Sequence, residues 1–151
     1  MRTKLMTAAN DVSGTIARVS LGIVMFPHGA QHALGWFGGA GFGGTIDYFG
    51  EVLGIPAFLT VLVIMAELLG SLALIVGLLS RAAAAGIAFV MLGAVFTVHL
   101  ESGFFMNWTG MQAGEGVEYH ILALGLAIVI MLKGSGAFSV DRMMVARSGG
   151  E

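Results

Sequence analysis

Two histidines lie one helical turn apart in the first apolar segment of the chain. His28 and His32 are four residues apart, so in a helix both imidazoles lie on the same face. Imidazoles are common ligands of zinc, copper and iron, haem iron included, and they can also hold a quinone head group by hydrogen bonds. This face is therefore predicted to form a metal site or a polar binding site.

The other two histidines lie at the ends of later apolar segments. His99 ends the third segment and His120 begins the fourth, with Glu101 and Glu118 close by in sequence. The predicted set of metal ligands is His28, His32, His99 and His120. The alternative is that these are ordinary polar residues near helix ends, where histidine is common.

Glu67 lies in the middle of the second apolar segment. It is eleven residues after Pro56, which at 1.5 Å per residue places it about 17 Å along a helix. An ionisable residue at that depth in a membrane is a functional candidate, here for proton transfer or ligand binding. The alternative is a buried ion pair with Arg18, which is predicted to lie only about 7 Å away in depth.

The elements that position these residues are four apolar helices. The chain of 151 residues is 57% hydrophobic and 11% charged, a composition that indicates a membrane protein. The predicted spans are residues 12–34, 56–79, 82–100 and 117–132, near the length of about 20 residues that a bilayer requires. We expect an all-α fold: one domain over residues 1–151, a polytopic four-helix membrane bundle.

The basic residues predict the topology. All seven Lys and Arg lie on one side of this plan. They precede or begin the first span, lie between the second and third spans, or follow the fourth: Arg2, Lys4, Arg18, Arg81, Lys133, Arg142 and Arg147. The connections at residues 35–56 and 101–117 contain none. Because cytoplasmic segments retain basic residues, both termini are predicted to be cytoplasmic, in a multi-pass protein of the inner membrane.

Glycine spacing predicts close helix packing. Gly14, Gly22 and Gly29 form one line on the first helix, and Gly86 and Gly93 form another on the third. At 100° per residue His99 is about 120° from that second line, so we expect it to face a loop or lipid.

A short helix is predicted to lie at the membrane interface between the first two spans. It covers residues 45–53, with Thr45 as its N-cap, and it is preceded by a glycine-rich stretch with aromatic residues.

Composition also excludes several functions. The chain has no cysteine, so thiol chemistry, iron–sulfur ligation and c-type haem attachment within it are excluded. No basic patch indicates nucleic acid as a partner. The ten methionines are scattered and are better explained as core residues than as copper ligands.

Several short motifs, in order along the chain, resemble the DoxX family. They are Arg18 with Leu21-Gly22, Phe26-Pro27-His28-Gly29, Leu53-Gly54-Ile55-Pro56, Glu67-Leu68-Leu69-Gly70, Gly77 to Arg81, His99 with Gly103-Phe104-Phe105, Gly116 to His120, and Gly134 to Asp141. The resemblance implies a small four-helix membrane protein. One branch of the family is the small membrane subunit of thiosulfate:quinone oxidoreductase, and another is associated with a membrane oxidoreductase complex that includes superoxide dismutase and a sulfurtransferase.

One position departs from the family pattern. Many relatives have lysine where this chain has His32, so a fixed cation is replaced by a group that titrates near neutrality. This difference weakens the transfer of an anion-binding role and favours a metal or proton role.

We therefore predict a subunit of a membrane redox system that binds a quinone or a similar redox partner, with metal or haem as alternative cofactors. Glu67 and Arg18 are the predicted catalytic residues, and the predicted cofactor-binding residues are His28, His32, Glu67, His120 and Glu118. The expected partners are the lipid bilayer, other redox subunits and a second copy of the chain. The alternative functions are a non-catalytic scaffold for an oxidoreductase complex and a small proton-linked carrier.

Overall fold

The structure, a computed structural model, describes residues 11–148. The secondary structure within this range is helical, with connecting loops and no strand. The α-helices are α2 (Val12–Leu34), α3 (Gly41–Glu51), α4 (Ala57–Val76), α5 (Ser80–Ala94), α6 (Glu118–Lys133) and α7 (Val140–Ser148). Val95–His99 continues α5 as a π-helical turn, and 3-10 turns cover Trp36–Gly38 and Leu100–Ser102. The all-α prediction is confirmed for this range, whereas Arg2 and Lys4 lie outside it.

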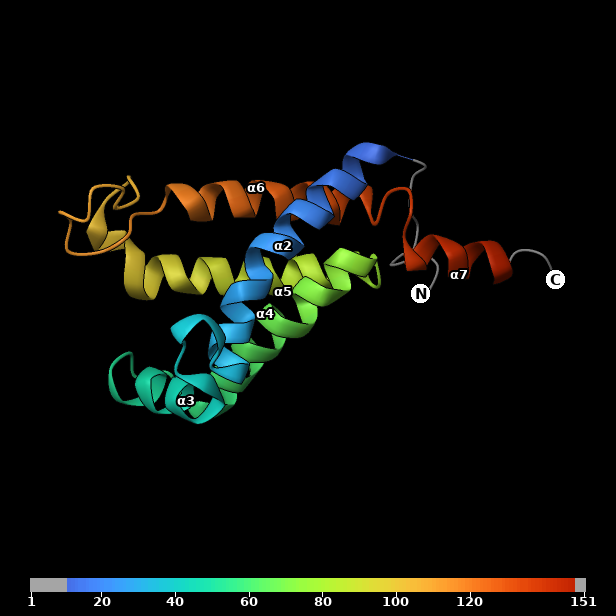
Figure 1. The fold of residues 1–151 in the computed structure, drawn as a ribbon. Helices are drawn as coiled ribbons and strands as arrows, with labels where there is room; N and C mark the ends of the chain where they lie inside the picture. Colours follow the sequence, from blue (N-terminus) through green and yellow to red (C-terminus); the bar gives the residue numbers. More distant parts are fainter. Residues whose placement is uncertain (1–10, 149–151) are drawn as a thin grey trace.

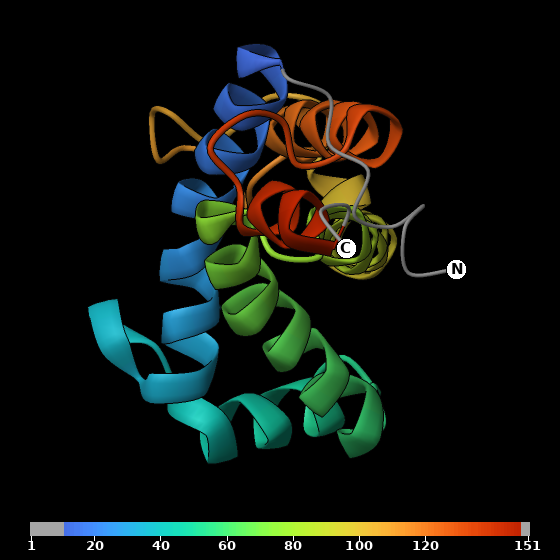
Figure 2. The same cartoon turned by 90° about the vertical axis from the view of Figure 1, so that its right-hand side faces the viewer.

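The long helices form two antiparallel pairs that cross one another (Figure 1). One pair is α2 with α4 and the other is α5 with α6, and α4 and α2 also contact the second pair. Viewed from the α7 end, the two pairs lie on opposite sides of the molecule (Figure 2). Apolar side chains from all four helices meet between the pairs, and the fully buried ones include Leu21, Met25, Leu74, Ile87, Ala127 and Ile130.

Two segments within residues 11–148 are long and apolar enough to cross a membrane, Ala57–Val76 and Ser80–Ser102. They correspond to the predicted spans 56–79 and 82–100. Large apolar side chains are nevertheless exposed on all four long helices, as in Ile16, Phe58, Phe89 and Leu122, which are 62%, 66%, 72% and 70% exposed. Exposed apolar surface on this scale marks contact with lipid or another protein.

Glycines bring α2 into close contact with α4, as the glycine spacing on the first helix predicts. A Cβ added at Gly22 would lie 2.9 Å from the Ser71 carbonyl oxygen, and one added at Gly29 would lie 2.5 Å from the Leu68 backbone nitrogen. Only glycine permits two helix backbones to approach so closely.

A short helix does follow α2, but it begins before the predicted residue 45. Thr45 was predicted to be its N-cap, and this is wrong because α3 begins at Gly41 and Thr45 lies within it. The buried Thr45 hydroxyl instead donates a hydrogen bond to the His32 carbonyl at 3.1 Å. Thr45 thus connects α3 to the last turn of α2.

Arg18 ties several segments together at the α7 end of the molecule. Its side chain is 1% exposed, and its guanidinium donates to the carbonyls of Leu74, Ile75, Ser135 and Phe138 at 2.6–2.8 Å. The predicted ion pair between Arg18 and Glu67 is wrong. The physical reason is that the last carbonyls of α4 lack helical partners, and the forked guanidinium satisfies them together with the loop after α6.

Asp141 is the second polar group at this end. Its fully buried carboxylate accepts hydrogen bonds from the backbone nitrogens of Leu79 and Ser80, at 2.8 and 3.2 Å, and from the Ser135 hydroxyl. It therefore caps the N-terminus of α5 from a distant part of the chain.

The start of α2 is capped by Asp11, which accepts from the Ser13 backbone nitrogen at 2.9 Å and pairs with Lys133 at 2.8 Å. The hydrogen bonds from Lys133 and Ser13 hold the pKa of Asp11 well below its usual range. The cap is therefore charged throughout the neutral pH range.

Replacing Arg18 with leucine is expected to destabilise the protein by about 3 kcal/mol or more, since each buried carbonyl left without a donor costs about 1–3 kcal/mol. Equilibrium unfolding in detergent measures this loss. Lys133→Ala is the control at the same end, and it should change stability little because exposed ion pairs contribute little. Equal effects of the two substitutions would contradict the assigned role of Arg18.

Adding one methyl group at Gly29 is expected to destabilise the fold by about 1–3 kcal/mol, because it meets the backbone of α4. Gly125→Ala is the matched control within α6, where an added Cβ has no atom within 4 Å. That change should be neutral or stabilise the helix by up to about 1 kcal/mol. Thermal unfolding of both variants compares them, and a stable Gly29→Ala protein would refute the close contact.

Candidate functional site

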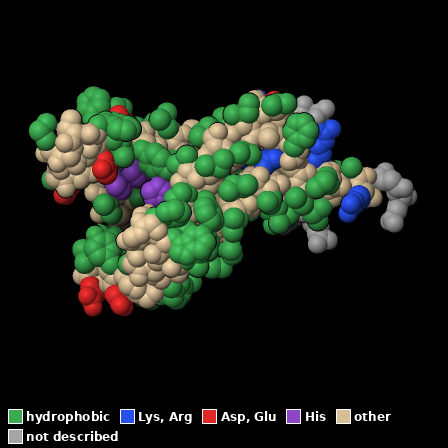
Figure 3. All heavy atoms as spheres, in the orientation of Figure 1, with side chains coloured by type: hydrophobic (Ala, Val, Ile, Leu, Met, Phe, Trp, Pro, Cys, Tyr) green, Lys and Arg blue, Asp and Glu red, His purple; other side chains and the backbone are tan. Residues whose placement is uncertain are grey.

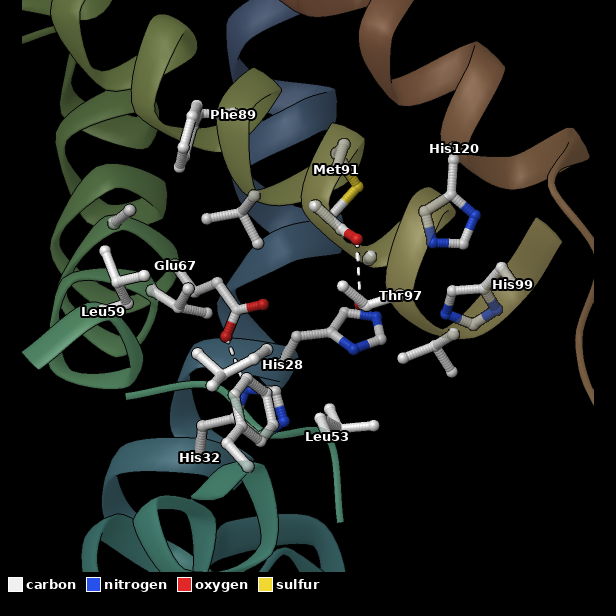
Figure 4. A pocket seen from close by; sticks show the side chains of 18 of the residues that line it. His28, His32, Leu53, Leu59, Glu67, Phe89, Met91, Thr97, His99 and His120 are labelled. Atoms are coloured by element: carbon white, nitrogen blue, oxygen red, sulfur yellow. Dashed lines mark hydrogen bonds and ion pairs between the residues drawn. The ribbon is translucent and has the colours of Figure 1, made fainter. Parts of the chain in front are cut away.

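A partly buried acid–imidazole pair lies where α2 meets α4. The Nδ1 atom of His32 is 2.5 Å from a carboxylate oxygen of Glu67, and Glu67 is only 4% exposed (Figure 4). Gly29 makes this geometry possible, since the close backbone contact at Leu68 puts the next turn of α2 beside Glu67. The pair leaves Nε2 of His32 as the ring nitrogen that can contact a ligand.

This pair faces a cavity of about 810 Å³. The polar side chains that line it are His28, His32, Glu67, His99, Glu115, Tyr119 and His120, with Tyr48 and Thr97. Apolar residues of α4, of α5 and of the connection between α3 and α4 form the remaining walls. In the space-filling view the histidines lie in a hollow, with most Asp and Glu at that end and Lys and Arg at the α7 end (Figure 3).

His28 and the later histidines meet around Tyr119, a cavity residue that the sequence analysis did not single out. The rings of His28 and Tyr119 are 6.1 Å apart, those of Tyr119 and His120 are 5.4 Å apart, and those of His120 and His99 are 4.2 Å apart. The Tyr119 hydroxyl donates to the sulfur of Met25 at 3.3 Å. Its motif, Glu118-Tyr119-His120, was the only sequence signal that could have identified it.

His99 contacts the loop at Glu115, as the prediction that it faces a loop or lipid allows, but it also lines the cavity, which was not predicted. The π-helical turn at Val95–His99 changes the angle between residues, so the 100° spacing assumed for an α-helix does not hold there. The Nδ1 atom of His99 is 2.8 Å from the Glu115 carbonyl. Because a carbonyl oxygen can only accept, Nδ1 carries the hydrogen in this contact.

Two other predicted positions differ from expectation. Glu118 is not among the cavity-lining residues, and its carboxylate instead accepts a hydrogen bond from the Trp108 indole at 3.0 Å, which ties the outer loop to α6. The predicted packing seam of Gly86 and Gly93 holds only in part: a Cβ added at Gly86 would lie 3.6 Å from Ala66 of α4, but both glycines also border the cavity. A Cβ added at Gly93 would have no atom within 4 Å.

The histidines do not converge on one point. Among residues 11–148, no three His, Asp or Glu side chains are arranged to hold a metal ion. His32 is paired with Glu67, and His99 lies against His120. Metal binding by the four histidines therefore stays a prediction that this arrangement does not support.

A double-mutant cycle tests the pair between His32 and Glu67. His32→Ala leaves the buried Glu67 carboxylate without its partner. The loss of unfolding free energy that it causes should therefore be about 1–3 kcal/mol larger in the wild-type protein than in a protein that already carries Glu67→Gln. Unfolding in detergent at neutral pH measures each variant. The control cycle combines His32→Ala with Glu118→Gln and should be additive, since Glu118 bonds to Trp108; equal coupling in both cycles would contradict the pair.

Comparisons with known proteins agree with this fold and composition. The DoxX family profile matches residues 14–100. A Bacillus subtilis (strain 168) protein named "Putative oxidoreductase CatD" is 30% identical over 136 residues, which make up 90% of this chain and 90% of that protein. An Escherichia coli (strain K12) protein named "Inner membrane protein YqjF" is 31% identical over 144 residues, covering 92% of this chain and 97% of that protein.

No solved structure matches the chain. The family profile covers more than half of the sequence, and CatD is 30% identical across most of it. This chain therefore belongs to the DoxX family of membrane proteins.

Proposed function

We propose that this chain is a membrane subunit of a redox system and that it binds a quinone in the cavity beside Glu67. The observation that carries this proposal is the combination of the partly buried His32–Glu67 pair with largely apolar walls in one cavity of about 810 Å³. Cavities of this size and character are typical of sites for small organic ligands. The name of CatD, an oxidoreductase, is consistent with a redox role.

In this proposal the four long helices form a bundle that spans the membrane, and the cavity opens toward the outer side. The exposed apolar side chains of α2 and α6 support two further spans beside α4 and α5. The 16-residue α6 is about 24 Å long, so its ends must reach the interface through side chains such as Lys133.

The orientation follows from charge. Arg81, Lys133 and Arg142 belong to the α7 end, which we place in the cytoplasm with both termini. The histidines then lie in the outer half, and the inner membrane is the proposed location, as the name of YqjF suggests.

The cavity side chains suit the proton chemistry of a quinone. Its carbonyl oxygens accept hydrogen bonds, which imidazole N–H groups of His28, His32 and His120 can donate. When a quinol is oxidised, two protons and two electrons leave it. We propose that the His32–Glu67 pair accepts one of these protons, that the neutral imidazole of His28 accepts the other, and that both electrons pass to a partner redox protein.

Quinone titration of the detergent-purified protein tests this function. Glu67→Gln and His32→Ala should each weaken binding about 10-fold to 100-fold, because a hydrogen bond to a charged group contributes about 1.5–3 kcal/mol. Glu118→Gln is the control and should bind like the wild type, since Glu118 is bonded to Trp108.

Metal analysis and a visible spectrum of the same samples separate the alternatives. Stoichiometric metal or haem that is lost in a His28→Ala/His32→Ala variant would replace quinone as the proposed cofactor. If the wild-type protein binds no quinone, metal or haem, the remaining proposal is that the chain is a non-catalytic scaffold for an oxidoreductase complex.

A further inference from the structure

Helices α4 and α5 are in contact near the turn that joins them and are apart at the far end of α5. Near the turn, a Cβ added at Gly70 would lie 3.6 Å from the Ile87 side chain. Further along, a Cβ added at Gly86 would still be 3.6 Å from Ala66, whereas one added at Gly93 would have no atom within 4 Å. The two helices are therefore in contact from the turn as far as Gly86 and apart at Gly93, and both glycines border the cavity.

The side chains along this separation are apolar. Leu59 and Leu62 of α4 and Phe89 of α5 line this part of the cavity, and Leu62 and Phe89 are 60% and 72% exposed. In the close-up view, Leu59 and Phe89 lie on one side and His99 and His120 lie on the other (Figure 4). The cavity thus has a polar part and an apolar part, and the apolar part continues to the outer surface of the protein.

The apolar part opens between the two helices that are long and apolar enough to cross a membrane. An opening between such helices faces hydrocarbon instead of water. A water-soluble ligand would not be stabilised by the apolar opening between α4 and α5. A ligand with a polar ring and a long apolar chain matches both the polar part and the apolar part of the cavity.

We propose that the opening between α4 and α5 is the path by which a quinone enters from the bilayer and that it holds the polyprenyl chain of the bound molecule. This inference rests on the proposed quinone site and specifies the ligand class, a quinone with a long isoprenoid chain. The ring lies beside Glu67 and His32, and the chain passes along Gly93 toward the lipid. The volume of about 810 Å³ suits a ligand of drug size, which is larger than a quinone ring alone.

Gly93 offers a direct test, because a larger side chain there enters the cavity without meeting protein atoms at Cβ. Gly93→Leu should weaken binding of a polyprenyl quinone by about tenfold or more and change binding of the same ring without its chain by less than about twofold. Gly125→Leu on the exposed side of α6 is the control and should alter neither affinity. Leu62→Trp narrows the opening from the α4 side and should repeat the result of Gly93→Leu.

The outcomes separate this inference from the proposed function. If Gly93→Leu and Leu62→Trp bind both quinones like the wild type, or lose both equally, the chain path is refuted. In that case, continued binding of the chain-free ring by the wild type, weakened by Glu67→Gln, would leave the quinone site itself intact. If the wild type binds neither quinone, both the site and the path are refuted.

Discussion

The buried guanidinium of Arg18 is the interaction on which the arrangement of the helices depends. In apolar surroundings the backbone groups at helix ends need partners within the protein. Arg18 supplies donors to the end of α4 and to the loop after α6, and Asp141 supplies acceptors to the start of α5. One cation and one carboxylate therefore join α2, α4, α5 and α7 at one end of the molecule, which leaves the other end free to open.

Glycine determines how far the helices separate from that fixed end. At Gly22 and Gly29 the absence of a side chain lets α2 lie directly against α4, and this contact brings His32 to Glu67. At Gly93 the same absence leaves space, because no part of α4 reaches that position. The acid–imidazole pair thus follows from the close contact of α2 with α4, and the adjoining cavity follows from the separation of α5 from α4.

Glycine permits close helix packing at some positions and leaves open space at others, and these two roles bear on which features could be predicted from sequence. Long runs of apolar residues predicted the four long helices, and the four-residue spacing placed His28 and His32 on one face, which borders the cavity. The partners of Arg18 could not be predicted from its depth along a straight helix. That estimate takes no account of the angle at which α2 crosses α4, or of the backbone carbonyls that lack partners at the end of α4. A line of glycines has the same pattern whether it packs or borders a cavity, and a π-helical turn, which moved His99 inward, has no simple periodicity.

The identity of residue 32 bears on what the site can do. A lysine at this position, which the resemblance to the DoxX family leads us to expect, would place a permanent cation beside the Glu67 carboxylate. The Nδ1 atom of His32 lies 2.5 Å from the Glu67 carboxylate, and an imidazole, unlike an ammonium group, can either donate or accept a hydrogen bond. Because Glu67 is buried and both residues line the cavity, a ligand bound there can contact the pair directly. Histidine at position 32 therefore suits the proton transfer that we propose for this pair better than lysine would.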